Sequence, residues 1–330
     1  MPSVLRYPSQ GTQIYAKQNY HLNTQTPAPF EGSKAYAQLL IFFGMFGIAF
    51  FFLGIVTLLL QQTGLFNLVL IQNPASYVDE QVVMDARNYQ LICDFILFVL
   101  PVLVFSFLVS KKVAAYLQMD SLGKFSLLIL GGLTIIASTP LINYFAELNS
   151  RVPLPDMLQN LEQTGDELEK ALLSHHNLKD LIFNLFVMAF MAGLCEELFF
   201  RAGLQKILIK MTKNTHVGVW IAAIVFSAIH LQFSGFVPRM LLGVFLGYLF
   251  VWSGSIWVNI FAHFMFNGTQ IFVLYLQDSK KPLKIVDDIY SQTPEMAYVI
   301  ASAVLVAILI VVIYKLSDKK PEEALQQNIE

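Results

Sequence analysis

The chain has 330 residues, of which 56% are hydrophobic and 13% charged, whereas soluble domains carry about 25% charged residues. Its mean hydropathy of +0.59 and its 28 phenylalanines indicate more apolar surface than one water-soluble core can bury, so we expect a membrane protein. A net charge of -2, from 21 basic and 23 acidic residues, offers no positive field for nucleic acid and excludes it as a partner.

Residues 1–34 are rich in Gln, Thr, Tyr and Pro and predict a flexible tail. From residue 35 to 317, apolar runs long enough to cross about 30 Å of hydrocarbon alternate with polar connections. Because lipid offers no partner for exposed backbone groups, these runs predict an all-α membrane domain of about eight spanning helices. Their ranges are 35–60, 91–109, 125–145, 181–208, 217–231, 236–252, 256–276 and 296–314. Residues 318–330 are expected to form a second tail.

The distribution of Lys and Arg predicts the orientation, because cytoplasmic segments carry an excess of both. With the N-terminus inside, most of the 21 basic residues fall on the cytoplasmic side, so we expect both tails in the cytoplasm of a bacterial cell. The segment from Glu147 to Lys179 carries Leu161, Leu168 and Leu172 among acidic residues. It is either a surface helix lying on the bilayer or a solvated linker.

Charged side chains within predicted spans are costly, about 2.5–3.5 kcal/mol each at the helix centre, and therefore indicate function. The fourth span carries Glu196, Glu197 and Arg201. Glu197 and Arg201 are four residues apart and suit an ion pair on one helix face. Glu196 remains, next to small residues, and is a candidate general base.

Two later spans each carry a histidine four residues from another side chain, as Phe226 with His230 and His263 with Asn267. Glu196 and His230 lie equally far before and after the predicted turn between their antiparallel helices, so they should reach the same height. We therefore expect the three helices to form one pocket from these polar groups. Taken alone, each histidine or asparagine in a span is more often a helix-packing residue than a catalyst.

Other polar and small residues in the spans receive structural interpretations. Asp94 and Arg239 are expected to form an ion pair, and Gly243 with Gly247 to allow close helix packing. Cys195 adjoins the glutamates but is expected to be a packing thiol. With only Cys93 besides, no disulfide framework or thiolate zinc cluster is expected.

A carboxylate that accepts a proton from water, a histidine that orients the water and donors for an oxyanion are what amide hydrolysis requires. The sequence has neither a zinc-binding HExxH helix nor a GxSxG nucleophile elbow. Two alternatives are open. One is a non-enzymatic immunity or scaffold protein that uses the polar groups as interhelical contacts. The other is a proton-coupled transporter, which lacks the support of an inverted repeat here.

Three motifs in this order resemble the type II CAAX prenyl protease family, also called CPBP or ABI, of intramembrane endopeptidases. They are Glu196-Glu197-x-x-x-Arg201, Phe226-x-x-x-His230 and His263-x-x-x-Asn267. The resemblance covers about residues 180–275 and implies an eight-helix endopeptidase whose cavity opens toward the cytoplasm. It implies these roles: Glu196 as general base, His230 as holder of the water, His263 and Asn267 as oxyanion stabilisers, and Glu197 with Arg201 as residues that shape the site.

The same residues leave open whether the protein binds a metal cofactor. Glu196, His230 and His263 would make a zinc site with one open position. The family is commonly described as metallopeptidases, yet a metal-free mechanism that depends on glutamate is also argued for its prenyl-protein members. The expected partners are the lipid bilayer and a peptide or membrane-protein substrate, including lipidated ones.

Overall fold

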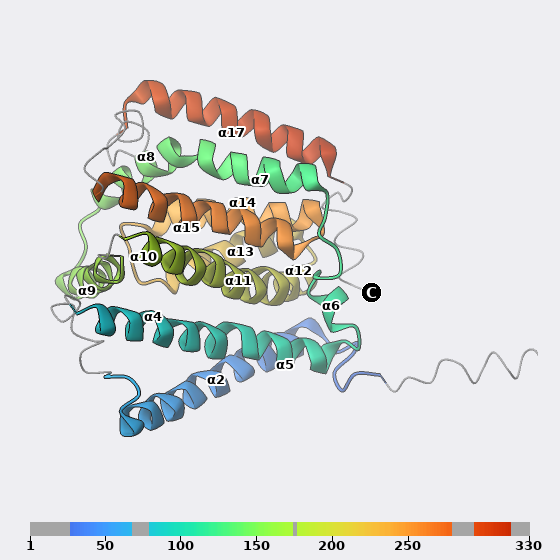
Figure 1. Ribbon diagram of the computed structural model, residues 1–330. Coiled ribbons are helices and arrows are strands. Elements are labelled where there is room, and N and C mark those ends of the chain that lie inside the picture. Colours follow the sequence, from blue (N-terminus) through green and yellow to red (C-terminus); the bar gives the residue numbers. More distant parts are fainter. Residues whose placement is uncertain (1–26, 68–78, 174–176, 279–293, 318–330) are drawn as a thin grey trace, which may run out of the picture.

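The computed structural model describes residues 27–67, 79–173, 177–278 and 294–317 (Figure 1). Within these ranges all regular structure is helical and no strand occurs, which confirms the all-α class. Residues 1–26 and 318–330 of the predicted tails lie outside the described residues. The helices are α2 (Ala35–Thr63), α4 (Glu80–Asp94), η2 (Phe95–Val99), α5 (Leu100–Val109), α6 (Val113–Tyr116), α7 (Phe125–Ala137), α8 (Thr139–Ser150), α9 (Asp156–Leu172), α10 (Leu178–Asn184), η3 (Leu185–Met191), α11 (Ala192–Glu197), η4 (Leu198–Gln205), α12 (Lys206–Thr212), α13 (Thr215–Ala228), α14 (Phe236–Ser253), α15 (Ile256–Asp278) and α17 (Met296–Leu316).

Each of the eight predicted spans contains a helix, but fewer helices meet the demands of length and apolar composition for crossing a membrane. Five do so: α2, the continuous α4–α5 helix, the continuous α10–α12 helix, α14 and α17. A sixth is α7 with α8, if this pair, bent by 45°, is one span. The bend follows from Pro140, which lacks the N–H of a regular helical hydrogen bond. The structure thus describes a multi-pass protein with five or six candidate spans.

The helices lie side by side, with α2 and α17 on the two outer sides of the bundle (Figure 1). In the most apolar windows of α2 and α17 only 17% of residues are buried, against 50% in α14, so these outer helices present apolar faces to the surroundings. Inside, aromatic side chains from different helices pack edge to face around Phe42, Phe199 and Phe226. This core holds the helix that carries Glu196.

Close helix contacts depend on glycine at the positions where the sequence shows it. A Cβ atom at Gly243 would lie 3.1 Å from the Cβ of Ala223, and one at Gly247 would lie 2.7 Å from Val219. Helix α14 therefore packs tightly against α13, as the spacing of these glycines predicts. Both helices also contribute to the wall of the cavity described below, through Phe226 of α13 and Leu242 of α14.

The two ends of the bundle differ. Ala35, Val109 and Leu316 lie at one end, which we call the terminal end, and contacts such as Lys124 Nζ to the Leu316 carbonyl hold it together. At the opposite end, which we call the α9 end, α9 lies beside the start of α4 (Figure 1). The segment between Glu147 and Lys179 therefore contains a helix, and the linker interpretation is wrong for residues 156–172.

Candidate active site

The long helix from Leu178 to Thr212 places the two glutamates on different sides. Glu196 and Glu197 end a short α-helical stretch, α11, between two π-helical stretches, η3 and η4. π-Helical turns alter which side chains share a face and occur often at functional sites. Glu197 is fully buried, whereas 18% of the Glu196 side chain is exposed and it lines a cavity.

Glu197 is the centre of a buried polar group. Its Oε1 atom accepts a hydrogen bond from His263 Nδ1 at 2.8 Å, and Oε2 accepts one from Asn259 Nδ2 at 3.1 Å. The predicted ion pair with Arg201 is confirmed, with Nε 3.1 Å from Oε2. The Arg201 guanidinium also lies over the Phe226 ring, 4.8 Å from its centre. The carboxylate and the aromatic ring lower the cost of this buried charge, while the guanidinium nitrogens make no hydrogen bond within the described residues.

Glu196 faces both histidines. Its Oε2 atom is 3.6 Å from His263 Nε2, and its Oε1 atom is 4.0 Å from His230 Nε2. The other nitrogen of each ring is committed, since His263 Nδ1 bonds to Glu197 and His230 Nδ1 bonds to the Phe226 carbonyl at 2.8 Å. These oxygens only accept, so both rings donate from Nδ1, and neutral rings present an acceptor at Nε2 to Glu196.

His230 does not lie within the helix as predicted. Helix α13 ends at Ala228, and Leu231 adopts a left-handed conformation with φ of +56°. Such a backbone is strained for a leucine and turns the chain away from the helix axis. The predicted end of this span at residue 231 is therefore wrong, because the chain leaves the helix to place Gln232 in the cavity wall.

Asn267 lines the same cavity but does not touch the glutamates. Its Nδ2 atom donates a hydrogen bond to the Met188 carbonyl at 3.2 Å, which ties α15 to η3. The structure thus brings five of the six predicted residues into direct contact or near contact and the sixth, Asn267, into the wall beside them.

Asn259 is a member of this group that the sequence reasoning missed. It is fully buried, and its Nδ2 atom donates to both Glu197 and the Leu246 carbonyl. The signal was present, since Asn259, His263 and Asn267 are spaced by four residues along one helix. Asn259 lies one helical turn before His263, so this spacing could have placed Asn259 in the same group.

The cavity has a volume of about 270 Å³ and its lining includes Glu196, His230, His263 and Asn267. Asp94 and Arg239 line it too, but they do not form the predicted ion pair. Asp94 accepts a hydrogen bond from Gln90, and Arg239 donates to the carbonyl and side chain of Gln232. Each of the two charges is held by an uncharged neighbour, and both face the cavity.

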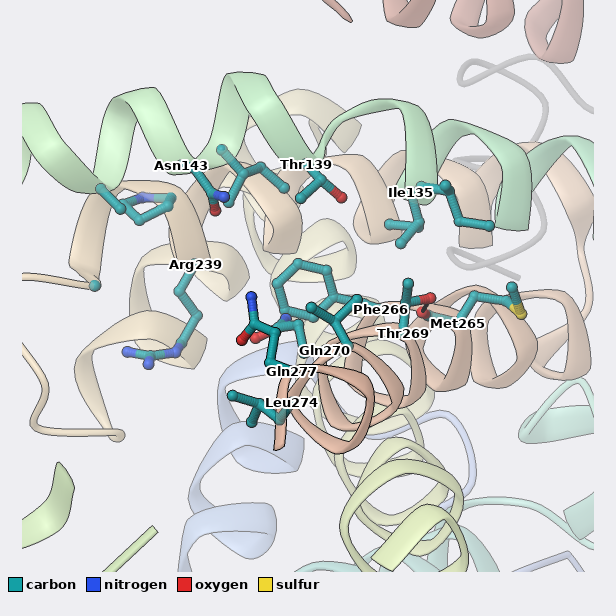
Figure 2. A pocket seen from close by; sticks show the side chains of 16 residues that line it. Ile135, Thr139, Asn143, Arg239, Met265, Phe266, Thr269, Gln270, Leu274 and Gln277 are labelled. Carbon is teal, nitrogen blue, oxygen red and sulfur yellow. Dashed lines mark hydrogen bonds between the residues drawn. The ribbon is translucent and has the colours of Figure 1, made fainter. Parts of the chain in front are cut away.

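A larger, mainly apolar groove of about 510 Å³ adjoins the cavity. Figure 2 shows Ile135, Thr139 and Asn143 at the bend between α7 and α8 facing residues of α15 across this groove. The groove runs along both α7 and α8, between which the chain bends by 45°. The groove and the cavity share four lining residues: Arg239, Phe266, Gln270 and Leu274.

The cavity lies toward the α9 end of the bundle. Its lining includes Glu169 and Leu173, at and just beyond the end of α9, and Gln232. Both described chain ends lie at the terminal end (Figure 1). The expectation of cytoplasmic termini together with a cavity that opens toward the cytoplasm stays a prediction, and the cavity lining and the described chain ends belong to opposite ends of the bundle.

The residues do not fit the zinc alternative. In a tetrahedral zinc site, bond lengths near 2.1 Å bring ligand atoms to about 3.4 Å of one another. The separation of 4.0 Å between Glu196 and His230 exceeds this. In the described part of the chain, no three His, Cys, Asp or Glu side chains gather in a way that would hold a metal ion.

Together, the bundle and its cavity define a multi-pass membrane protein with a buried glutamate and histidine site. Residues 178–269 match the sequence profile of the type II CAAX prenyl endopeptidase Rce1-like family, and the chain carries a domain of this family. All six predicted site residues fall within the match.

One relative is the uncharacterized protein YpbD of Bacillus subtilis (strain 168), which is 28% identical over 105 residues. The aligned part is 31% of this chain and 49% of YpbD, so the chain spans about half the length of this relative. No solved structure matches the chain.

Proposed function

We propose that this protein is an intramembrane endopeptidase in which Glu196 activates a water molecule for attack on a peptide bond. The observation that carries the proposal is the position of Glu196 between the Nε2 atoms of His230 and His263, at 4.0 and 3.6 Å. Polar atoms separated by more than about 3.5 Å suit a bridging water. One hydrogen of such a water would point to Glu196 and the other to His230 Nε2, leaving an oxygen lone pair for the attack.

The proton then moves through Glu196. Attack on the carbonyl carbon transfers the water proton to Glu196, which delivers it to the leaving amine as the C–N bond breaks. The developing oxyanion would accept hydrogen bonds from Asn267 Nδ2 and from His263 Nε2, for which the His263 ring takes up one proton from solvent before the attack and keeps it through the step. Glu197 supports this role by holding His263 Nδ1, and Arg201 balances the charge of Glu197.

The proposal includes all eight helices as membrane crossings. Helix α15 has 23 residues and is about 35 Å long, enough to span the hydrocarbon, although its Asn and His side chains lower its hydropathy. Helix α13 has 14 residues and is about 21 Å long, and the segment up to Gly235 completes the return to the α9 end. The polar groups that shorten α13 or lower the hydropathy of α15 are the same groups that form the site.

For the orientation, we propose that both termini are cytoplasmic and that the cavity opens to the opposite face. Among the described residues, more basic side chains lie at the terminal end than at the α9 end. Those at the terminal end are Lys34, Lys111, Lys112, Lys124, Lys206, Lys210, Lys213 and Lys315. Those at the α9 end are Arg87, Arg151, Lys170, Lys179 and Arg239.

The apolar groove beside the cavity supports a membrane-associated substrate. Its lining by Ile135, Ile142, Phe266 and Leu274 would receive an apolar segment or a lipid chain while the peptide bond lies at Glu196. Peptides, membrane proteins and prenylated proteins all have such parts, and the groove accommodates any of them.

The experiment is to compare the peptides in membranes of cells that carry the wild-type chain or Glu196→Gln. The variant keeps the size of the side chain but cannot accept the proton, so cleavage should fall by about 10²- to 10⁴-fold and uncut substrate should accumulate. Glu80→Gln, at an exposed position, is the matched control and should cleave normally. Normal processing by Glu196→Gln at equal expression would support the non-enzymatic alternative instead.

A further inference from the structure

Asp94 is a buried carboxylate for which the proposed hydrolysis has no role. It is 7% exposed and lines the catalytic cavity from the end of α4. Its Oδ1 atom accepts a hydrogen bond from Gln90 Nε2 at 2.8 Å. Its Oδ2 atom has no hydrogen-bond or ion-pair partner in the described part of the chain. One oxygen of a carboxylate that is more than nine-tenths buried is therefore uncommitted and next to the cavity.

The cavity as a whole is acidic. Three carboxylates line it, those of Asp94, Glu169 and Glu196, against the single guanidinium of Arg239. Asp94 and Glu196 face this cavity together. Two like charges in a confined, poorly hydrated space are costly unless a cation joins them.

The nearby arginines do not supply that cation. Arg87 is paired with Asp180 at 3.1 Å, and Arg201 is paired with Glu197. Arg239 donates to Gln232, whose side-chain amide in turn donates to Asp166 and Glu169 of α9. The charge of Asp94 is thus left without a balancing cation by the protein itself.

We propose that Asp94 and Gln90 form a subsite that binds the basic side chain of a Lys or Arg residue close to the scissile bond of the substrate. The uncommitted Oδ2 of Asp94 would accept from the ammonium or guanidinium group, and the carbonyl oxygen of the Gln90 side chain would accept a second hydrogen bond. This inference rests on the proposed function for the identity of the ligand as a peptide. A metal ion fits less well, since three ligating side chains do not gather here among the described residues.

The first test measures binding and needs no cleavage. Full-length Glu196→Gln protein in detergent is titrated with pools of labelled, amidated octapeptides that carry Lys, norleucine or Glu at one fixed position. The Lys pool should bind about tenfold more tightly than the norleucine pool, as expected for a buried charge pair. Adding Asp94→Asn should remove this preference, and adding Asp94→Lys should shift it toward the Glu pool.

Asp85→Asn is the matched control. Asp85 lies on the same helix as Asp94 and accepts a hydrogen bond from Gln81, just as Asp94 accepts one from Gln90, but Asp85 does not line the cavity. It should leave the preference for Lys unchanged. Asp94→Asn keeps an oxygen for Gln90, and its thermal unfolding temperature shows whether it is folded. A folded Asp94→Asn protein that still prefers Lys, or a Glu196→Gln protein without any preference, would overturn the subsite.

The second test separates this inference from the proposed function. With Glu196 intact, kcat/KM is measured for any Lys-containing peptide that is cleaved and for its norleucine counterpart. Asp94→Asn should lower kcat/KM about tenfold for the Lys peptide alone. If Asp94→Asn instead changes the pH profile of kcat/KM and leaves the preference for Lys unchanged, Asp94 is a proton store and the subsite is overturned. The loss of cleavage in Glu196→Gln tests only the proposed function.

Discussion

At the scale of residues, the site depends on how Glu197 is held. Its two oxygens are shared among His263, Asn259 and Arg201, and it is fully buried. A buried carboxylate that loses a donor pays a desolvation cost that water cannot relieve. Side chains that do not face the cavity therefore control the orientation of the imidazole that does.

Asn259 is the clearest case, because it does not line the cavity and its side chain acts through Glu197. Asn259→Ala removes the donor to Glu197 and the one to the Leu246 carbonyl, so we expect a loss of about 1–3 kcal/mol in the free energy of unfolding. As His263 becomes less well oriented, kcat should fall more than KM rises. Thermal unfolding and steady-state kinetics measure both, and Asn160→Ala, on the exposed side of α9, is the control. An unchanged kcat would show that Asn259 has a structural role only.

At the scale of elements, the helices that carry the site approach one another through glycine. Gly218 of α13 lies against Ile209 of α12, where a Cβ atom would be 2.5 Å from Cγ1 and 2.8 Å from the backbone nitrogen. Backbone cannot move aside as a flexible side chain can. The turn near Lys213 that brings His230 back to the level of Glu196 therefore depends on this contact.

Gly218→Ala should accordingly separate α12 from α13. We expect a loss of about 1–3 kcal/mol in the free energy of unfolding, as for other overpacked contacts, and lower activity because His230 moves with α13. Gly44→Ala on α2 is the control, since nothing lies within 4 Å of its added Cβ, and alanine there should be neutral or slightly stabilising. Equal thermal stability of the two variants in detergent would contradict the importance of this contact.

At the scale of the whole molecule, the orientation has a direct test, because the cavity and the chain ends lie at opposite ends of the bundle. Single cysteines at Lys112, at the terminal end, and at Val152, at the α9 end, report on the two faces once Cys93 and Cys195 are replaced. With cytoplasmic termini, a membrane-impermeant maleimide should label Val152→Cys in intact cells and Lys112→Cys only after permeabilisation. The reverse pattern would place the cavity on the cytoplasmic side and the termini outside.

Much of this protein follows from local sequence. Apolar runs predict the helices because lipid excludes unpaired backbone groups, and the four-residue spacing predicts the Glu197–Arg201 pair because those side chains meet on one helix face. The three motifs also identify the residues that gather at the cavity, since charged and polar groups in spans are costly and rarely retained without a partner or function.

Tertiary structure decided what depends on contacts between distant segments. The break after α13, the place of Asn259 beneath Glu197, the separation of Asp94 from Arg239 and the position of the cavity relative to the chain ends all depend on which helices become neighbours. Local hydrophobicity and spacing are properties of one helix at a time, whereas the partner of a buried polar group is chosen by the packing of several. For this reason the sequence alone indicated six residues that gather at or beside the cavity, whereas only the folded chain added Asn259 and Asp94 and determined what each residue touches and toward which end of the bundle the cavity lies.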